Sequence, residues 1–178
     1  TRFFAYYDNY DNNFETYSGN VTEYIDKYVE AMNEECTSNS MEIDAHRKVF
    51  ETMLSYSEKV LGDRGFKKSK NSKSTPRARF EALAVGIALA IKENPELEYK
   101  DVSEWIDGEE FLSLIKSDAA NNKSKLLKRI NYVKDSLLGE WFMETIVATF
   151  LSRESEIDKL LSTMKFLEYK EKNKDEFG

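Results

Sequence analysis

Apolar residues recur at helical spacing in the first third of the chain and predict two helices there. Asn20 stands at the N-cap position of the first, and Glu23 follows in a capping-box arrangement, so we expect a helix over 21–35. The second helix is predicted over 41–61, and Gly62 is placed to end it in a left-handed conformation. A short polar stretch separates the two helices.

The middle of the chain holds its most apolar segment. It reads FEALAVGIALAI, with Glu81 as the one charged residue. Thr75-Pro76 before the segment is a typical helix start, with Pro at the first helical position, and Asn94-Pro95 after it ends the helix. A helix that is apolar on nearly all faces must be covered on most of its surface. We therefore predict a buried central helix near 76–92.

The helical pattern continues through the rest of the chain. Neither a hairpin signal nor an internal repeat appears, so the predicted fold class is all-α, an irregular multi-helix bundle of about six to eight helices around the central helix. One domain over 1–178 fits the length, with a flexible basic loop at 64–75 and a frayed tail at 172–178. The remaining predicted helices are two short ones near 102–106 and 111–115, an amphipathic one over 124–138 before Gly139, and segments at 140–153 and 154–172.

Composition indicates a soluble globular protein. The 178 residues include 26 Lys and Arg against 33 Asp and Glu, and 40% are hydrophobic, which is enough to form a core. The single Cys36 excludes an internal disulfide and a multi-cysteine zinc site, and no apolar run reaches the roughly 18 residues that span a bilayer. We expect a cytoplasmic protein with no membrane partner. Because the chain starts at Thr1 without Met, we also expect a fragment of a longer protein.

The sharpest charge asymmetry lies in residues 64–79, which carry seven basic residues and no acidic one in a chain of net charge -7. Lys and Arg neutralise phosphates in nucleic-acid complexes, and the predicted helix over 124–138 adds a basic outer face. These two features are either a solubilising surface or a nucleic-acid site with DNA as the partner. The candidate nucleic-acid-binding residues are Lys67, Lys68, Lys70, Lys73, Arg77, Arg79, Lys125, Lys128 and Arg129.

Arg77 and Arg79 fall in the first turn of the predicted central helix. Cations there oppose the helix dipole by ~0.3–1 kcal/mol, so each arginine needs a compensating partner. That partner is either an acidic side chain of the same domain, from the 101–110 segment, or a phosphate held at the helix N-terminus.

Residues for other chemistry are sparse. His46 is the only histidine, which excludes His-based metal triads and an HNH nuclease centre, and no glycine-rich phosphate loop is present. A Cys36–His46 contact stays open, as do carboxylate or metal sites in the acidic groups at 34–35, 107–110 and 154–158. We predict no catalytic residue, no metal site and no cofactor, and therefore no enzymatic activity of this chain.

Several strings resemble a known family. They are TRFFAYYDNYDNNF at the start, GFKKSKNSKSTPRARFEALAVGIALAIKENPEL in the middle and SDAANNKSKLLKRINYVKDSLLG after it. Together they are similar to the C-terminal helical part of the domain of unknown function 262 family, which is related to GmrSD-type, modification-dependent restriction systems. The resemblance covers about residues 1–140. In that family a ParB/sulfiredoxin-like N-terminal domain carries a nucleotide-using Asp-Gly-Gln-Gln-Arg motif, and some members add an HNH nuclease domain.

The chain departs from the catalytic part of that pattern. It contains no Gln, so the motif is absent, and one histidine cannot build an HNH centre. The resemblance implies a non-catalytic accessory domain of a restriction or phage-defence protein, with an upstream nucleotidase-like or nuclease-like domain as its partner. The aromatic side chains of residues 3–17 are the predicted contact with that domain. The alternatives are a nucleic-acid-binding module that uses 64–79, and a hydrolase that uses carboxylates and a metal.

Overall fold

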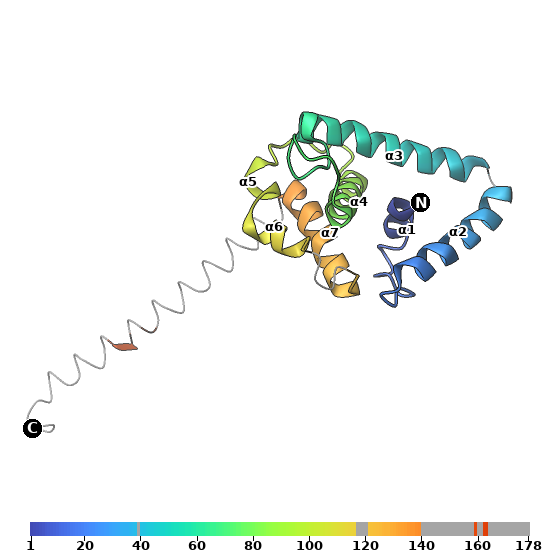
Figure 1. Cartoon of the computed structure of the whole chain (residues 1–178), viewed down its shortest axis with the longest axis horizontal. Coiled ribbons are helices and arrows are strands. Elements are labelled where there is room, and N and C mark those ends of the chain that lie inside the picture. The colour runs from blue at the N-terminus through green and yellow to red at the C-terminus, as the bar shows by residue number, and fades with distance from the viewer. Residues whose placement is uncertain (39, 117–120, 140–158, 160–161, 164–178) are drawn as a thin grey trace, which may run out of the picture. The chain divides into compact units, whose positions relative to one another are not determined.

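The computed structural model describes residues 1–38, 40–116, 121–139, 159 and 162–163 (Figure 1). The chain divides into two units, Thr1–Gly139 and Glu140–Gly178. Apart from residues 159, 162 and 163, which are helical, the predicted segments at 140–153 and 154–172 and the tail at 172–178 lie outside the described residues. The single domain predicted over 1–178 therefore stays a prediction, and the first unit is described by itself.

Every regular element of the described residues is helical, which confirms the predicted all-α bundle. The predicted helices of the first unit are all present, and one short N-terminal helix is added that the sequence pattern did not predict. The elements are α1 (Arg2–Asp8), α2 (Val21–Ser38), α3 (Ser40–Leu61), the 3-10 helix η1 (Gly62–Arg64), α4 (Arg77–Glu93), α5 (Ser103–Ile106), α6 (Glu109–Leu114) and α7 (Lys123–Leu138).

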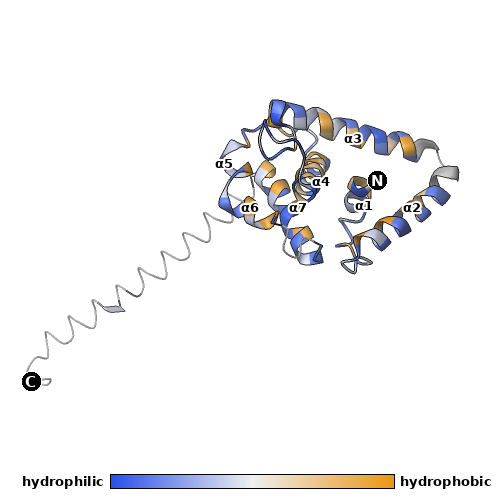
Figure 2. Ribbon diagram, in the orientation of Figure 1, coloured by the Kyte–Doolittle hydropathy of each residue, from blue (hydrophilic) through white to orange (hydrophobic). Residues whose placement is uncertain are grey.

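Helix α4 is the centre of the core, as predicted. Every residue from Glu81 to Ala90 is buried, and α1, α3 and α7 all pack against the helix. Figure 2 shows the apolar residues of α4 at the middle of the unit. Its alternating small side chains, Ala82, Ala84, Gly86, Ala88 and Ala90, let neighbouring helices approach it closely.

Helices α4 and α7 run in the same direction. Glu81 contacts Arg129, and Glu93, at the C-terminal end of α4, contacts Lys134. Between these pairs, Gly86 lies so close to α7 that a Cβ atom on it would be 2.6 Å from the Cβ of Val133. The glycine is therefore required by the close approach of the two helices.

The ends of the helices follow the local signals with one correction. Asn20 accepts a hydrogen bond from the Glu23 N–H at 3.3 Å, and Gly62 follows α3 with φ 55°. The predicted first helical residue of α4, Pro76, is instead its N-cap, because its ψ of 130° is extended. The side chain of Asn122 caps α7 by accepting from the Ser124 and Lys125 N–H groups.

Four of the seven aromatic residues in 3–17 are buried and are not available for the contact predicted for this group. Phe3, Tyr6, Phe14 and Tyr17 are buried inside the first unit. Tyr6 stacks on Tyr24 of α2 with ring centroids 6.1 Å apart, and Phe3 meets Phe50 of α3 edge-on at 5.2 Å. Burial in their own domain satisfies these four side chains, whereas Phe4 is only half-buried and lines an open groove.

Helices α2 and α3 form the two arms of a V. They approach each other where α2 ends and α3 begins and then spread apart, with α1 between them (Figure 1). Helices α3 and α1 also pack on α4, so the V is anchored to the core along α3 and through α1.

Candidate functional site

The basic loop before α4 is held by Arg64, a residue outside the predicted nucleic-acid site. The Arg64 guanidinium donates to both carboxylate oxygens of Asp107 at 2.6 and 2.5 Å, and to the carbonyl oxygens of Lys67 at 2.9 Å and Lys68 at 2.5 Å. Hydrogen bonding from Arg64 lowers the pKa of Asp107, which keeps that carboxylate ionised. The loop is thus fastened at its start to the turn between α5 and α6.

Most of the side chains predicted to contact phosphates are exposed, and two are buried. Five described side chains are exposed, namely Lys68, Lys70, Lys73, Lys125 and Lys128, and Lys67 is half-buried. Arg77 is also exposed, lies 3.8 Å from Glu81 and donates to Asn121 at 3.3 Å. Because α4 and α7 start at the same end of the unit, the loop that leads to Arg77 lies beside the start of α7. The structure thus brings the end of the basic loop and part of the basic face together.

Arg79 is a correction to the predicted site. Its side chain is 0% exposed, so it cannot contact a phosphate in the folded domain. It donates to the Ile106 carbonyl oxygen at 3.1 Å, lies 3.8 Å from Asp107 and faces the Phe111 ring. These partners include the acidic side chain of the 101–110 segment that the first-turn argument predicted. Burial first, and then the charge of Arg64, lower the pKa of Arg79 to about 10, so it stays charged at neutral pH.

Arg129 is the second correction, because its side chain is only 2% exposed. It donates to Glu81 at 2.6 Å, and Arg2 of α1 donates to the other carboxylate oxygen of Glu81 at 2.8 Å. The carboxylate therefore joins α1, α4 and α7 inside the core. The isolated charge of Glu81 in an apolar run was the sequence signal for this network, although its partners could not be read from the sequence.

His46 takes part in a polar cluster that joins α1, α2 and α3. Its Nε2 lies 2.9 Å from Oδ2 of Asp8, and its Nδ1 lies 2.9 Å from the Glu42 carbonyl oxygen. The Tyr28 hydroxyl donates to the same Asp8 oxygen. Burial by itself lowers the pKa of His46, but the hydrogen bonds to Asp8 and Glu42, with the charges of both carboxylates, outweigh it and raise the pKa.

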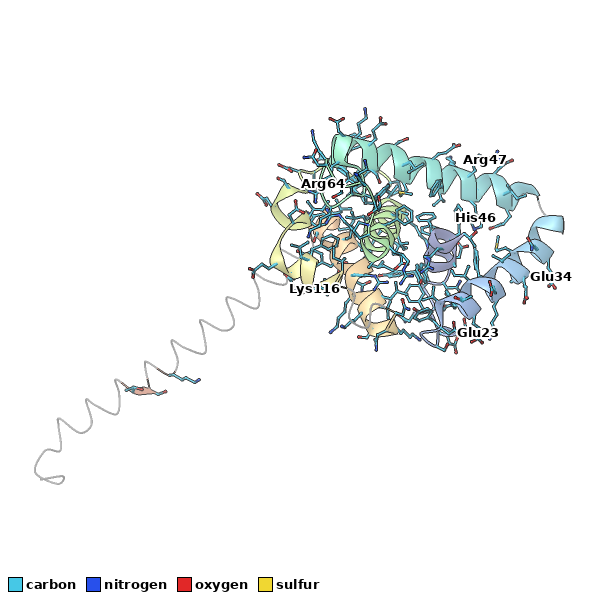
Figure 3. All side chains as sticks on the ribbon, in the orientation of Figure 1. Glu23, Glu34, His46, Arg47, Arg64 and Lys116 are labelled. Carbon is cyan, nitrogen blue, oxygen red and sulfur yellow. The ribbon has the colours of Figure 1, made fainter. Side chains whose placement is uncertain are left out.

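An apolar groove opens beside this cluster. It encloses about 460 Å³ between α1, α2 and α3, and Figure 3 shows His46 and Arg47 on the α3 side. Its apolar lining is Phe4, Val29, Met32, Ile43 and Phe50. The polar lining includes Asn33 of α2 and Arg47, which pairs with Asp44 at 3.0 Å. The groove could not be predicted from the sequence because three separate elements build it.

Comparison of the chain with protein-family models, with curated proteins and with solved structures found no match. The family resemblance stated above therefore stays a prediction.

The remaining candidate chemistry gains no support from the structure. Within the described part of the chain, no three His, Cys, Asp or Glu side chains gather in a way that could hold a metal ion. The Cys36 side chain and the acidic group at 154–158 lie outside what the structure describes. Among the described helices, none combines the length and apolar character needed to cross a bilayer.

Proposed function

We propose that the chain is a non-catalytic, all-helical accessory domain that binds a catalytic partner domain, as in a cytoplasmic restriction or phage-defence protein of the domain of unknown function 262 type. The observation that carries the proposal is the groove between α1, α2 and α3. Apolar side chains that a fold leaves uncovered at this scale commonly mark an interaction site. The partner implied by the resemblance is an upstream domain with the Asp-Gly-Gln-Gln-Arg motif.

The state of His46 supports a non-catalytic role. Both ring nitrogens face oxygen acceptors, the Asp8 carboxylate and the Glu42 carbonyl. A general base needs a ring nitrogen that can accept a proton from substrate, and this arrangement favours the imidazolium form. The cluster therefore serves to hold α1, α2 and α3 together around the groove.

The test is binding of the chain to a separately expressed domain that carries the Asp-Gly-Gln-Gln-Arg motif, measured by sedimentation velocity. Ile43 lines the groove and is 43% exposed, so Ile43→Ser should weaken the complex about tenfold without unfolding the domain. Tyr99→Ser is the matched control, since Tyr99 is exposed outside the groove. Equal binding by both variants would exclude the groove as the interface. Turnover of ATP or GTP, or DNA cleavage, by the purified chain would contradict the non-catalytic role.

A nucleic-acid-binding module is the second candidate, and the exposed lysines of the basic loop and α7 support it. Binding through them should weaken with salt, with a slope near -0.9 per phosphate contact. Changing Lys68, Lys70 and Lys73 to Ser should then reduce the electrophoretic shift of duplex DNA and flatten the salt slope. Changing Lys27, Lys48 and Lys59 to Ser removes the same charge from α2 and α3 and should have a smaller effect. No shift of wild type at low salt would rule the module out.

A further inference from the structure

A second, smaller pocket lies between α1, α3 and α4. It encloses about 330 Å³, and its lining shares no residue with the groove. The residues of α3 that line it are Ala45, Lys48, Val49 and Thr52, whereas those that line the groove are Ile43, His46, Arg47 and Phe50. The two sets are offset by two positions, which is about 200° around a helix. Helix α3 therefore presents opposite faces to the two cavities.

The apolar part of this lining comes from both α3 and α4. Val49 and Ile91 are half-buried, and Ala88 is 4% exposed. Pockets that bind small molecules begin at about 300 Å³, and an apolar cavity of about 150 Å³ holds benzene. The pocket therefore has room for one aromatic ring or a short alkyl chain together with a polar head group.

Every polar side chain of the lining can donate a hydrogen bond, and none is a carboxylate. These side chains are Lys48, Lys92, Tyr7 and Thr52. Burial raises the pKa of the Tyr7 hydroxyl, so this group keeps its proton at neutral pH. Two ammonium groups and two hydroxyl groups beside an apolar wall suit an anion that carries an apolar body.

One of the two ammonium groups is already paired. Nζ of Lys92 lies 2.7 Å from Oδ2 of Asp11 and 5.7 Å from the centre of the Tyr7 ring. Asp8 also attracts Lys92, but its carboxylate is held by His46 in the polar cluster on the groove side of α3. Asp11 is therefore the carboxylate that competes with a ligand for Lys92.

The other ammonium group, on Lys48, is uncompensated among the residues that the structure describes. Asp44 and Glu51 lie one turn before and after it on α3, but Asp44 pairs with Arg47 and neither carboxylate is within ion-pair distance of Lys48. The two ammonium groups of the lining thus exceed the one paired carboxylate by a single charge. This balance favours a ligand with one negative charge.

We propose that the pocket binds a small monocarboxylate with an apolar body, such as an aryl-substituted short-chain acid. Its carboxylate lies toward Lys48 and the Tyr7 hydroxyl, and its body packs on Val49 and Ile91. The inference goes beyond the proposed function, because this site is separate from the groove. The ligand contacts α1, α3 and α4 at once, so its binding stabilises the folded domain.

The probe is 3-phenylpropanoate. Its amide and 3-phenylpropylamine keep the same body with a neutral or a cationic head group, and acetate keeps the charge without the body. Titration of the full chain, followed by amide chemical shifts in NMR spectra, measures affinity and locates the site. The carboxylate should bind at least about threefold more tightly than the amide, and the amine and acetate should bind more weakly still.

Two variants with matched controls test the head group and the body separately. Lys48→Gln should weaken the carboxylate about threefold, whereas Lys59→Gln removes the same charge from another exposed position of α3 and should leave affinity unchanged. Val49→Thr keeps the side-chain shape but adds a hydroxyl to the apolar wall, and should also weaken binding. Val29→Thr makes the same change in the groove and should have no effect.

A third variant should improve binding. The Asp11 side chain is 70% exposed, so Asp11→Asn frees Lys92 without disturbing the core and should tighten the carboxylate about threefold. Asp26→Asn changes the net charge equally at an exposed position of α2 and should leave affinity unchanged.

Four results would overturn the proposal. Equal affinities for the carboxylate and the amide would show that the pocket does not select anions. Equal losses in Lys48→Gln and Lys59→Gln would mean that the probe responds to the overall charge of the chain. A loss in Val29→Thr but not in Val49→Thr would place the probe in the groove. Absence of any chemical shift change at millimolar 3-phenylpropanoate would exclude the site.

Discussion

Gly86→Ala is predicted to destabilise the domain, although alanine is the better helix former. An added Cβ would lie 2.6 Å from Cβ of Val133, 2.8 Å from its Cγ1 and 2.9 Å from the Ile130 carbonyl oxygen. Ordinary contact begins near 3.4 Å, so relief requires α4 and α7 to move apart by about 0.8 Å. The Ile130 oxygen belongs to the backbone of α7, and a rotamer change therefore cannot remove the clash.

Two opposing effects set the magnitude. Replacing a helical Gly by Ala favours folding by about 1 kcal/mol, whereas overpacking a close helix contact costs about 1–3 kcal/mol and also loosens the neighbouring Glu81–Arg129 contact. The net loss is about 1–2 kcal/mol, which lowers the Tm of a chain this size by about 2–8 °C.

Thermal unfolding followed by circular dichroism measures the effect, and urea unfolding gives the free energy directly. Ser55→Ala on the exposed side of α3 is the control, since it improves helix propensity without a clash and should not lower Tm. A Tm for Gly86→Ala equal to or above that of wild type would refute the close approach of α4 and α7.

Three further predictions concern charged side chains. Glu81→Gln removes the carboxylate buried against an arginine of α7 and should cost about 3–5 kcal/mol, whereas Glu93→Gln, on an exposed pair of the same two helices, should cost less than about 1 kcal/mol in urea unfolding. The pKa of His46 is raised in the folded protein. Protonated His46 therefore stabilises the fold fully below about pH 6.5, and this stabilisation is lost as pH rises through the pKa of His46 in the folded protein. Asp8→Asn should reduce this fall in Tm between about pH 6 and 9. Arg64→Ala releases the start of the basic loop and should speed its cleavage by trypsin.

Each of these has an outcome that contradicts it. If Glu81→Gln and Glu93→Gln lowered the free energy of unfolding equally, burial would add nothing to the stabilisation by the Glu81 contacts. If Tm rose between about pH 6 and 9 in wild type and fell in Asp8→Asn, the direction assigned to the pKa shift of His46 would be wrong. Unchanged trypsin cleavage in Arg64→Ala would show that the loop is held by other contacts.

Helices with strong local signals could be predicted from the sequence. The cap at Asn20 and the left-handed Gly62 fixed the start of α2 and the end of α3, and the apolar run around Glu81 identified the central helix. Helix α1 was missed because its seven residues are too few to show a period, and its aromatic side chains are ordered by contacts with α2 and α3.

The candidate site was less predictable because it depends on contacts between distant segments. Arg79 and Arg129 look like surface cations in the sequence, yet each packs against a group 27 or 48 residues away. Arg79 becomes buried only when α5 lies beside α4, and Arg129 becomes buried only when α7 lies beside α4. The local sequence pattern does not encode these contacts between helices. The groove beside His46 likewise needs three helices in place before it exists.

The parallel arrangement of α4 and α7 also has a kinetic consequence. The helices that share the largest interface are separated by the segment 94–122, which must return along the full length of α4 before α7 can dock. Closing a loop of that length costs roughly 3 kcal/mol of chain entropy before any contact between the helices forms. An antiparallel pair with a short turn would avoid most of this barrier. We therefore expect docking of α7 to limit the folding rate, and substitutions at its interface with α4 to slow folding, whereas substitutions in the V of α2 and α3 should mainly speed unfolding.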